Sequence, residues 1–391
     1  MFAVLRLPGA LRAFLPALLG RSALAMAGLA LLLAVQKSTG SFADAGFASA
    51  AFGIANVVAA PWRARIIDRW GQRRALTAMG VAQSAAFIGL AAAAAAPHVP
   101  LTLFFALSVA VGITAPPLGA AMRVLWASLT TVGEQRKKAF SLDAVAEELL
   151  FVAGPVVVAA IIVATSASTG LLVTAAVVLI GTIGLTTSSV SGAQVGSVST
   201  AMRAHRPLRQ PGFTRVLLVL VAVGGVLGVV EIAAPALAEE QAAVAASGWL
   251  LAAFAAGSAI GGLVSGHMRW TASLGAKLFI LCVSMGATAV IVSQARPLLL
   301  FAAGLVLLGL FLAPSLITGY LVADAIVPEN GRTEASTWIN TAVNLGASLA
   351  SAAAGLLIDT SGSWLSLLLV GALAVVMASL VPFGRLRAIA A

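Results

Sequence analysis

The chain has 391 residues, of which 61% are hydrophobic and 9% are charged, and its formal net charge is +10. A soluble globular protein has about 25% charged residues, so this composition excludes a fold that faces water on all sides. The abundance of Ala, Gly, Leu and Val favours α-helices over a membrane β-barrel, whose strands show short alternating patterns. The basic residues lie in short segments between apolar runs, so the positive charge does not indicate nucleic-acid binding.

Twelve apolar runs are long enough to cross a bilayer as helices, which takes about 20 residues. In chain order, the predicted spans cover residues 14–35, 43–62, 76–96, 99–121, 140–164, 170–190, 216–237, 243–265, 274–293, 298–322, 335–358 and 363–383. The first run lacks a clear cleavage site, and we expect it to be retained as the first span. The sequence therefore predicts an all-α integral membrane protein embedded in the lipid bilayer.

The distribution of Lys and Arg predicts the orientation, because these residues stay mainly in cytoplasmic loops. If both termini are cytoplasmic, only Lys37 and Arg296 of the 23 basic residues fall on the opposite side. We expect a multi-pass monomer in the bacterial cytoplasmic (inner) membrane.

The two halves of the chain share two short patterns that recur in the same order. The matched pairs are residues 46–52 with 248–254, and Gly112 and Pro117 with Gly309 and Pro314. Parallel repeats of six spans are one recurring plan of transporters. We expect two pseudo-symmetric six-helix halves, residues 1–190 and 216–391, joined by a cytoplasmic central loop of residues 191–215.

A charged motif lies between the second and third spans, in residues 64–74. It resembles the motif Gly-x-x-x-Asp-Arg-x-Gly-Arg-Lys/Arg of the major facilitator superfamily, and the resemblance to this family covers essentially the whole chain. The matching residues are Asp68, Arg69, Gly71 and Arg73, whereas Ala64 and Gln72 depart from the pattern. The resemblance implies the major facilitator fold and a gating latch at the cytoplasmic helix ends; the alternative is a positive-inside anchor. We expect the change Gln72→Ala to have little effect, in contrast to the loss of the Asp68 charge.

A second motif, Gly154-Pro155 in the fifth span, resembles the drug:proton antiporter branch of the same family. The alternative is a proline kink of the kind that membrane helices tolerate. The arginine that this branch usually carries in the fourth span would fall at Ser108.

Acidic residues inside the apolar spans are the strongest chemical signal. They are Asp143, Glu147 and Glu148 in the fifth span and Glu231 in the seventh. A charge at a helix centre costs about 2.5–3.5 kcal/mol, so such residues usually face the bundle interior and carry function. Because a carboxylate removed from water can bind a proton near neutral pH, we take Glu148, Glu231 and Glu147 as proton-coupling candidates. The alternative is structural pairing, which we expect between Asp143 and Arg123.

Polar side chains in two other spans are candidates for the wall of a substrate cavity. They are Asn56 in the second span and Asn340, Asn344, Ser348 and Trp338 in the eleventh. The alternatives are hydrogen bonds between helices and, for Trp338, an anchor at the membrane interface.

No phosphate-binding loop, nucleophile–base pair or metal cluster is visible, and His98, His205 and His267 are far apart. We therefore expect no enzyme activity, cofactor or metal. The expected function is secondary active transport by alternating access, with proton-coupled efflux of a small amphipathic or drug-like molecule. One alternative is a proton-coupled or uniporting carrier of a sugar or amino acid. Another is a membrane sensor or assembly partner that does not transport.

Overall fold

The computed structural model describes residues 2–131, 134–192, 207–267, 272–327 and 332–381, and every regular element in these ranges is a helix. The predicted all-α fold is confirmed. Most of the expected central loop and the C-terminus lie outside the described residues, as do Arg203, Arg206, Arg269, Arg385 and Arg387.

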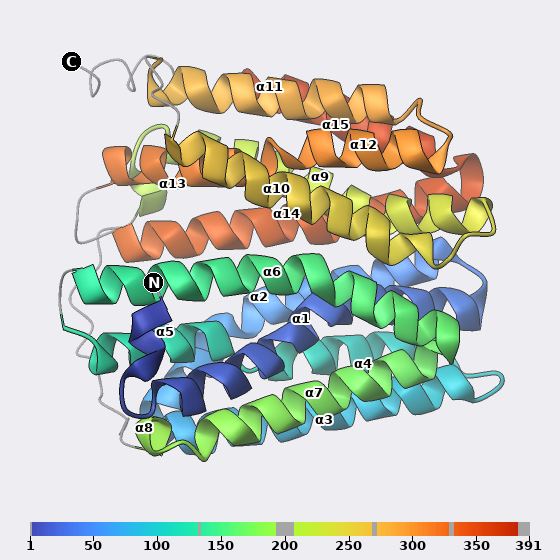
Figure 1. Ribbon diagram of the computed structural model, residues 1–391. Helices are drawn as coiled ribbons and strands as arrows, with labels where there is room; N and C mark the ends of the chain where they lie inside the picture. The colour runs from blue at the N-terminus through green and yellow to red at the C-terminus, as the bar shows by residue number, and fades with distance from the viewer. Residues whose placement is uncertain (1, 132–133, 193–206, 268–271, 328–331, 382–391) are drawn as a thin grey trace. The chain divides into compact units, whose positions relative to one another are not determined.

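The helices of the first part of the chain follow one another with short connections (Figure 1). They are η1 (Phe2–Arg6), α1 (Ala10–Thr39), α2 (Phe42–Trp70), α3 (Gln72–Ala95), α4 (Leu101–Thr114), α5 (Leu118–Leu129), α6 (Glu134–Ala164), α7 (Ala167–Thr186) and α8 (Ser189–Gly192).

The second part continues with the same kind of helix. Its elements are η2 (Pro207–Arg209), α9 (Phe213–Glu240), α10 (Ala246–His267), α11 (Leu274–Val292), α12 (Leu298–Gly309), α13 (Leu312–Ile326), α14 (Arg332–Ser361) and α15 (Ser363–Ala378).

The membrane spans agree with the sequence in number and order. In the described ranges, 11 helical segments are long and apolar enough to cross a bilayer, and α15 is a further apolar helix of 16 residues. The prediction placed the end of the twelfth span at residue 383, but α15 ends at Ala378. The chain is therefore a multi-pass membrane protein.

The fourth and tenth spans are broken, whereas the sequence analysis predicted them as continuous. The fourth consists of α4 and α5, separated by Ala115–Pro117, and extends to Leu129 rather than to residue 121. Proline has no N–H to donate, so the Pro116-Pro117 pair ends α4 and starts a new helix. The tenth span breaks at Leu310 and Phe311, shortly before Pro314. The Gly-x-x-x-x-Pro pattern of the two halves therefore marks a helix break in both.

The described chain divides into two compact units. Unit 1 contains Met1–Gly40 and Ala55–Thr200, and unit 2 contains Ser41–Ile54 and Ala201–Ala391. The division runs through α2, because its first half belongs to unit 2. The division into residues 1–190, 191–215 and 216–391 stays a prediction.

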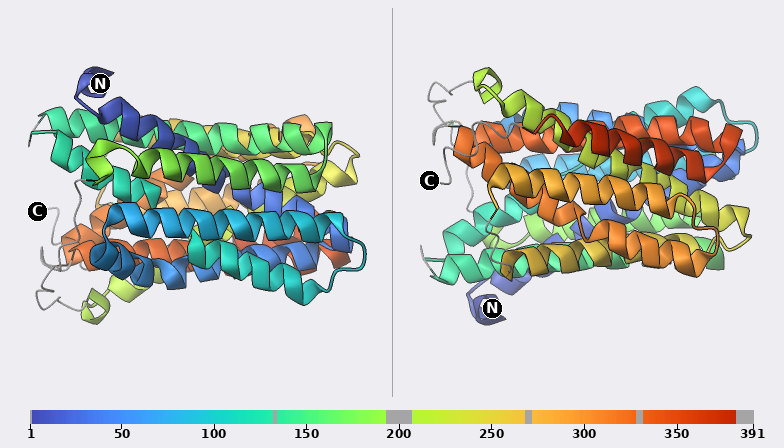
Figure 2. Two further views of the ribbon diagram at one scale, coloured as in Figure 1. Left: turned by 90° about the horizontal axis from the view of Figure 1, so that it is seen from below. Right: turned by 90° about the horizontal axis from the view of Figure 1, so that it is seen from above.

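The same helix pairs recur in both units, whose long helices run side by side (Figures 1 and 2). In unit 1, α1 packs against α5, α6 and α7, and α3 packs against α4 and α7. In unit 2, α9 packs against α13, α14 and α15, and α11 packs against α12 and α15. Each unit is thus organised around the first helix of its own half, which is what an internal repeat requires.

The start of α2 is held by α14, and both segments belong to unit 2. Asp359 accepts hydrogen bonds from the Ser41 hydroxyl (2.6 Å) and from the backbone N–H groups of Phe42 (2.9 Å) and Ala43 (3.0 Å). Gly355 lies so close to α2 that a Cβ atom there would be 2.3 Å from the Phe42 carbonyl oxygen. A carboxylate therefore caps the positive N-terminus of α2 from another helix.

Candidate functional site

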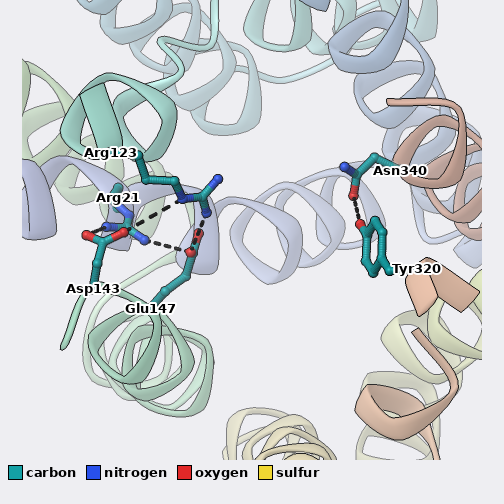
Figure 3. A network of polar contacts seen from close by, with 6 residues as sticks. All are labelled: Arg21, Arg123, Asp143, Glu147, Tyr320 and Asn340. Carbon is teal, nitrogen blue, oxygen red and sulfur yellow. Dashed lines mark hydrogen bonds and ion pairs between the residues drawn. The ribbon is translucent and has the colours of Figure 1, made fainter. Parts of the chain in front are cut away.

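Four charged side chains meet inside the membrane-spanning helices of unit 1 (Figure 3). Arg21 comes from α1, Arg123 from α5, and Asp143 and Glu147 from α6. The two acids are four residues apart, so they lie one helical turn apart on one face of α6. We call these four residues the charge cluster.

Arg21 and Asp143 form the buried pair of the charge cluster. Arg21 Nη1 donates to Asp143 Oδ1 at 2.8 Å, and the exposed fractions of the two side chains are 6% and 3%. A charge removed from water must be neutralised nearby, and these two residues neutralise each other.

Glu147 and Arg123 form the accessible pair. Arg123 Nη2 donates to Glu147 Oε2 at 3.2 Å, with exposed side-chain fractions of 56% and 32%. Arg21 Nη2 also lies 2.7 Å from the same Oε2 atom, as an ion pair without hydrogen-bond alignment. This pair is therefore less buried than the first, and its carboxylate is also within the field of Arg21.

The sequence assigned Asp143 to Arg123, but the structure places Asp143 closest to Arg21. Arg123 Nε is 3.9 Å from Asp143 Oδ2, which is a weak outer contact. The sequence analysis missed Arg21 because it was counted only as a basic residue near the cytoplasmic end. The available signal was its position inside the first apolar run, where an arginine needs an acidic partner.

Two further acids lie outside the charge cluster. Glu148 is exposed on α6, beside Glu147, and Glu231 is exposed on α9, a helix that is otherwise mostly buried. Within the part of the chain that the structure describes, neither forms an ion pair. Glu231 lies nine residues before the end of α9, which corresponds to about 14 Å along the helix. Because a carboxylate in lipid is costly, we expect both side chains to face water.

The polar side chains of α14 differ in how far they are exposed. Asn340 and Asn344 are exposed, and Asn340 Oδ1 accepts a hydrogen bond from the hydroxyl of Tyr320 at 2.7 Å (Figure 3). Ser348 is instead buried against Gly53, where an added Cβ would be 2.2 Å from Ser348 Oγ. Trp338 donates to Glu334 on its own helix at 3.4 Å. The sequence analysis missed Tyr320, the single tyrosine of the chain.

Asn56 belongs to a group of hydrogen-bonded side chains at the break in the fourth span. Buried Arg63 donates to both the backbone and the side-chain oxygen of Asn56 at 2.8 Å, and to the carbonyl oxygen of Gly112 at 2.7 Å. Gln83 donates to the Val111 carbonyl oxygen at 3.2 Å. The last carbonyl groups of α4 would otherwise lack donors inside the membrane. Sequence reasoning counted Arg63 only as a basic anchor.

The motif between α2 and α3 forms a one-residue turn at Gly71. Its φ angle of 78° lies in the region that favours glycine, which explains the glycine in the motif. Asp68, Arg69 and Arg73 are exposed around this turn, and no ion pair of Asp68 is present among the described residues.

The expectation that Gln72 has little effect does not fit its surroundings. Gln72 is buried; it donates to the Ala121 carbonyl oxygen (3.1 Å) and accepts from the Ser191 hydroxyl (3.0 Å). The departure from the family pattern therefore marks a buried contact between α3, α5 and α8, which sequence alone could not show.

The Gly154-Pro155 motif lies where α6 approaches α1. A Cβ atom on Gly154 would be 2.6 Å from the Cβ of Ala25, so only glycine permits this approach. Close helix packing through small residues is common in membranes.

A cavity lies away from the charge cluster, near the other end of α1. This cavity of about 620 Å³ is lined by Lys37, His98 and Ser166 among others, and Lys37 is about 24 Å along α1 from Arg21. In the described ranges, no three His, Cys, Asp or Glu side chains are grouped in a way that could hold a metal ion.

Repeated units of membrane-spanning helices, with charged and polar groups inside the spans, define a polytopic membrane protein of the transport type. The chain belongs to the Major Facilitator Superfamily, whose family model matches residues 14–230 and 216–388. It is accordingly a membrane transporter and not an enzyme.

Solved structures agree with this fold. The crystal structures of the nucleoside transporter NupG and of its D323A mutant are each 14% identical to the chain, with a TM-score of 0.76. The similarity covers 97% of this chain, 98% of NupG and 99% of the mutant. At this identity the likeness shows the fold alone. A comparison with curated proteins gives no match.

Proposed function

We propose that the chain is a proton-coupled secondary transporter that exports a small amphipathic or drug-like molecule by alternating access. The observation that carries this proposal is the charge cluster, in which the half-buried Glu147 is held by two arginines inside the spans. An ionisable group inside a membrane span is costly, and a proton relay is one of its main uses.

The proton-coupling candidates are distributed over both units. Glu148 and Glu147 lie on α6 of unit 1, and Glu231 lies on α9 of unit 2. Acids at separate positions can take up and release protons from opposite sides of the membrane. The exposure of Glu148 and Glu231 and the partial burial of Glu147, all in apolar helices, support this role.

The substrate is proposed to contact Asn340, Asn344 and Trp338 on α14, together with Tyr320. The exposed Tyr320–Asn340 hydrogen bond supports this assignment, because both side chains can exchange their bond for one with a substrate. Asn56 and Ser348 have weaker support, since one bonds to Arg63 and the other is buried.

Two motifs are proposed to act in gating. Asp68, Arg69, Gly71 and Arg73 would form a latch at the cytoplasmic helix ends in one transport state, and their exposure leaves them free to change partners. Gly154-Pro155 would allow α6 to move closely along α1, which its tight contact with Ala25 supports.

A second candidate function is uptake of a polar nutrient together with protons. It is favoured by the open Tyr320–Asn340 pair, which suits a hydrogen-bonding substrate, and by the likeness to a nucleoside transporter. The sign of coupling separates the two candidates, because export by exchange moves substrate and proton in opposite directions.

The test is transport of a panel of fluorescent dyes and radiolabelled nucleosides by cells with and without the gene, each with a protonophore control. Protonophore-sensitive loss of dye supports export, and protonophore-sensitive nucleoside uptake supports the second candidate. If expression changes neither the loss of dye nor the uptake of nucleosides, the proposed substrate class is wrong.

The proposed location is the bacterial inner membrane, with both termini cytoplasmic and the chain a monomer. A reporter active only in the cytoplasm, fused after residue 391 or inserted within residues 191–209, should be active at both positions. An inactive reporter at either position contradicts this topology.

A further inference from the structure

The exposed amides of α14 form a polar surface that is separate from the exposed apolar surface of the same helix. Asn340 and Asn344 are four residues apart and both exposed, so they lie one helical turn apart on one face. The exposed Leu345 and Leu349 lie about 140–180° around the helix from Asn340, at roughly 100° per residue. Between the two surfaces, Ser348 is buried against α2. The leucines therefore suit contact with lipid, and the amides face a different environment.

Each of these two amides already uses one of its two ends. The Tyr320 hydroxyl on α13 donates to Asn340 Oδ1 at 2.7 Å, and the two side chains point toward each other in Figure 3. Asn344 Nδ2 donates to the backbone carbonyl oxygen of Asn340 at 2.7 Å. Within the described residues, no protein group bonds to the other ends, Asn340 Nδ2 and Asn344 Oδ1. One donor and one acceptor are thus left on adjacent turns, whose Cβ atoms are about 5–6 Å apart.

The charges on α13 and α14 do not favour an anionic solute at these amides. The sequence of α13 contains no basic residue, and the only one on α14 is Arg332, at the start of that helix. The acids of the two helices, Asp324, Glu334 and Asp359, lie toward the helix ends. A carboxylate or phosphate group beside Asn340 would therefore find no positive partner on either helix within the adjacent turns.

Hydrogen bonding between helices explains only part of this arrangement. The bond from Tyr320 to Asn340 links α13 to α14, as a structural role requires. Asn344, however, is exposed, and among the described residues it bonds only to its own helix. A polar side chain in a membrane span is costly unless it packs against another helix or faces water or a solute. The position of Asn344 therefore fits contact with a solute better than a link between helices.

We infer that Asn340 and Asn344 determine specificity for an uncharged solute that carries an N–H donor next to a C=O acceptor, as a cyclic imide or a pyrimidine base does. The C=O group of the solute accepts from Asn340 Nδ2, and its N–H group donates to Asn344 Oδ1. Tyr320 holds the amide of Asn340 in the orientation that presents this donor. That the transported substrate binds here rests on the proposed function, whereas the recognition pattern stands on the two amides.

The experiment is isothermal titration calorimetry of the purified protein in lipid nanodiscs with two matched pairs of probes. The pairs are uridine with N3-methyluridine, and glutarimide with N-methylglutarimide; in each pair the methyl group removes the N–H donor and keeps both C=O groups. The parent protein should bind the N–H member of a pair about tenfold more tightly, because the methylated probe leaves Asn344 Oδ1 without a partner. Equal binding of both members, or no binding of any probe, overturns the assignment.

Variants separate recognition by the two amides from a structural role. Asn344→Leu should remove the difference in affinity within a pair, since its acceptor is gone, whereas Asn340→Leu should weaken both members and keep the difference. Leu349→Ala, on the apolar surface, is the control and should change neither affinity. A difference that persists unchanged in Asn344→Leu overturns the assignment. Binding with the expected pattern but without proton-driven transport of uridine would refute the proposed function alone, and proton-driven dye export with no binding of these probes would refute the inference alone.

Discussion

Arg21 is predicted to stabilise the fold far more than Arg123, although both contact the same two acids. Arg21→Gln leaves Asp143, whose side chain is 3% exposed, with only the 3.9 Å contact to Arg123. Removing one partner of a buried ion pair costs about 3–5 kcal/mol, because the remaining charge stays out of water. Arg123 is 56% exposed, so Arg123→Gln should cost about 0–1 kcal/mol.

The assay is unfolding of the purified protein by titration with a denaturing detergent. The double variant Arg21→Gln/Asp143→Asn removes both charges and should recover most of the loss, since neutral amides are cheaper to bury than one unpaired carboxylate. Equal destabilisation by Arg21→Gln and Arg123→Gln would refute the assignment of Arg21 as the buried partner. Additive losses in the double variant would refute the pairing itself.

Three other residues, the last with Asp44 as its control, give separate predictions. Gln72→Ala should lower the free energy of unfolding by about 1–3 kcal/mol, because it leaves the Ala121 carbonyl and the Ser191 hydroxyl without their partner; an unchanged unfolding midpoint would contradict this. Asp68→Asn should unfold like the parent protein but transport more slowly in vesicles, since the exposed carboxylate has no ion pair among the described residues to lose; full transport would favour the anchor role. Asp359→Asn should destabilise the protein by about 0.5–2 kcal/mol through loss of the charged cap on α2. Asp44→Asn, which removes a charge in the first turn of the same helix, should cost less. If Asp359→Asn and Asp44→Asn lose similar amounts of stability, the effect comes from net charge and not from the cap.

The membrane fold could be predicted from sequence because bilayer thickness sets the length of each apolar run. The breaks in the fourth and tenth spans were not predicted, since hydropathy is unaffected when a helix ends and restarts inside the membrane. The prolines near both breaks were visible, but at the end of α4 the donors that satisfy the free carbonyl groups come from Arg63 and Gln83, on other helices.

The acids of the site could also be found from sequence, because a carboxylate in an apolar run is rare. The partners of these acids could not be predicted from sequence, because pairing depends on how each helix is rotated and on which helix it packs against. The sequence analysis paired Asp143 with Arg123, whereas the packing of α1 against α6 brings Arg21 closer. The burial of Gln72 could not be predicted for the same reason, because its partners lie on α5 and α8.

We propose that substrate movement is coupled to protons through acids inside the spans. The most direct measurement is transport by the purified protein in liposomes under an imposed pH gradient, with Glu147→Gln, Glu148→Gln and Glu231→Gln compared with the parent. We expect gradient-driven accumulation to be lost in Glu231→Gln and in Glu148→Gln or Glu147→Gln, while exchange of labelled for unlabelled substrate without a gradient continues. Full gradient-driven accumulation in all three variants would contradict it.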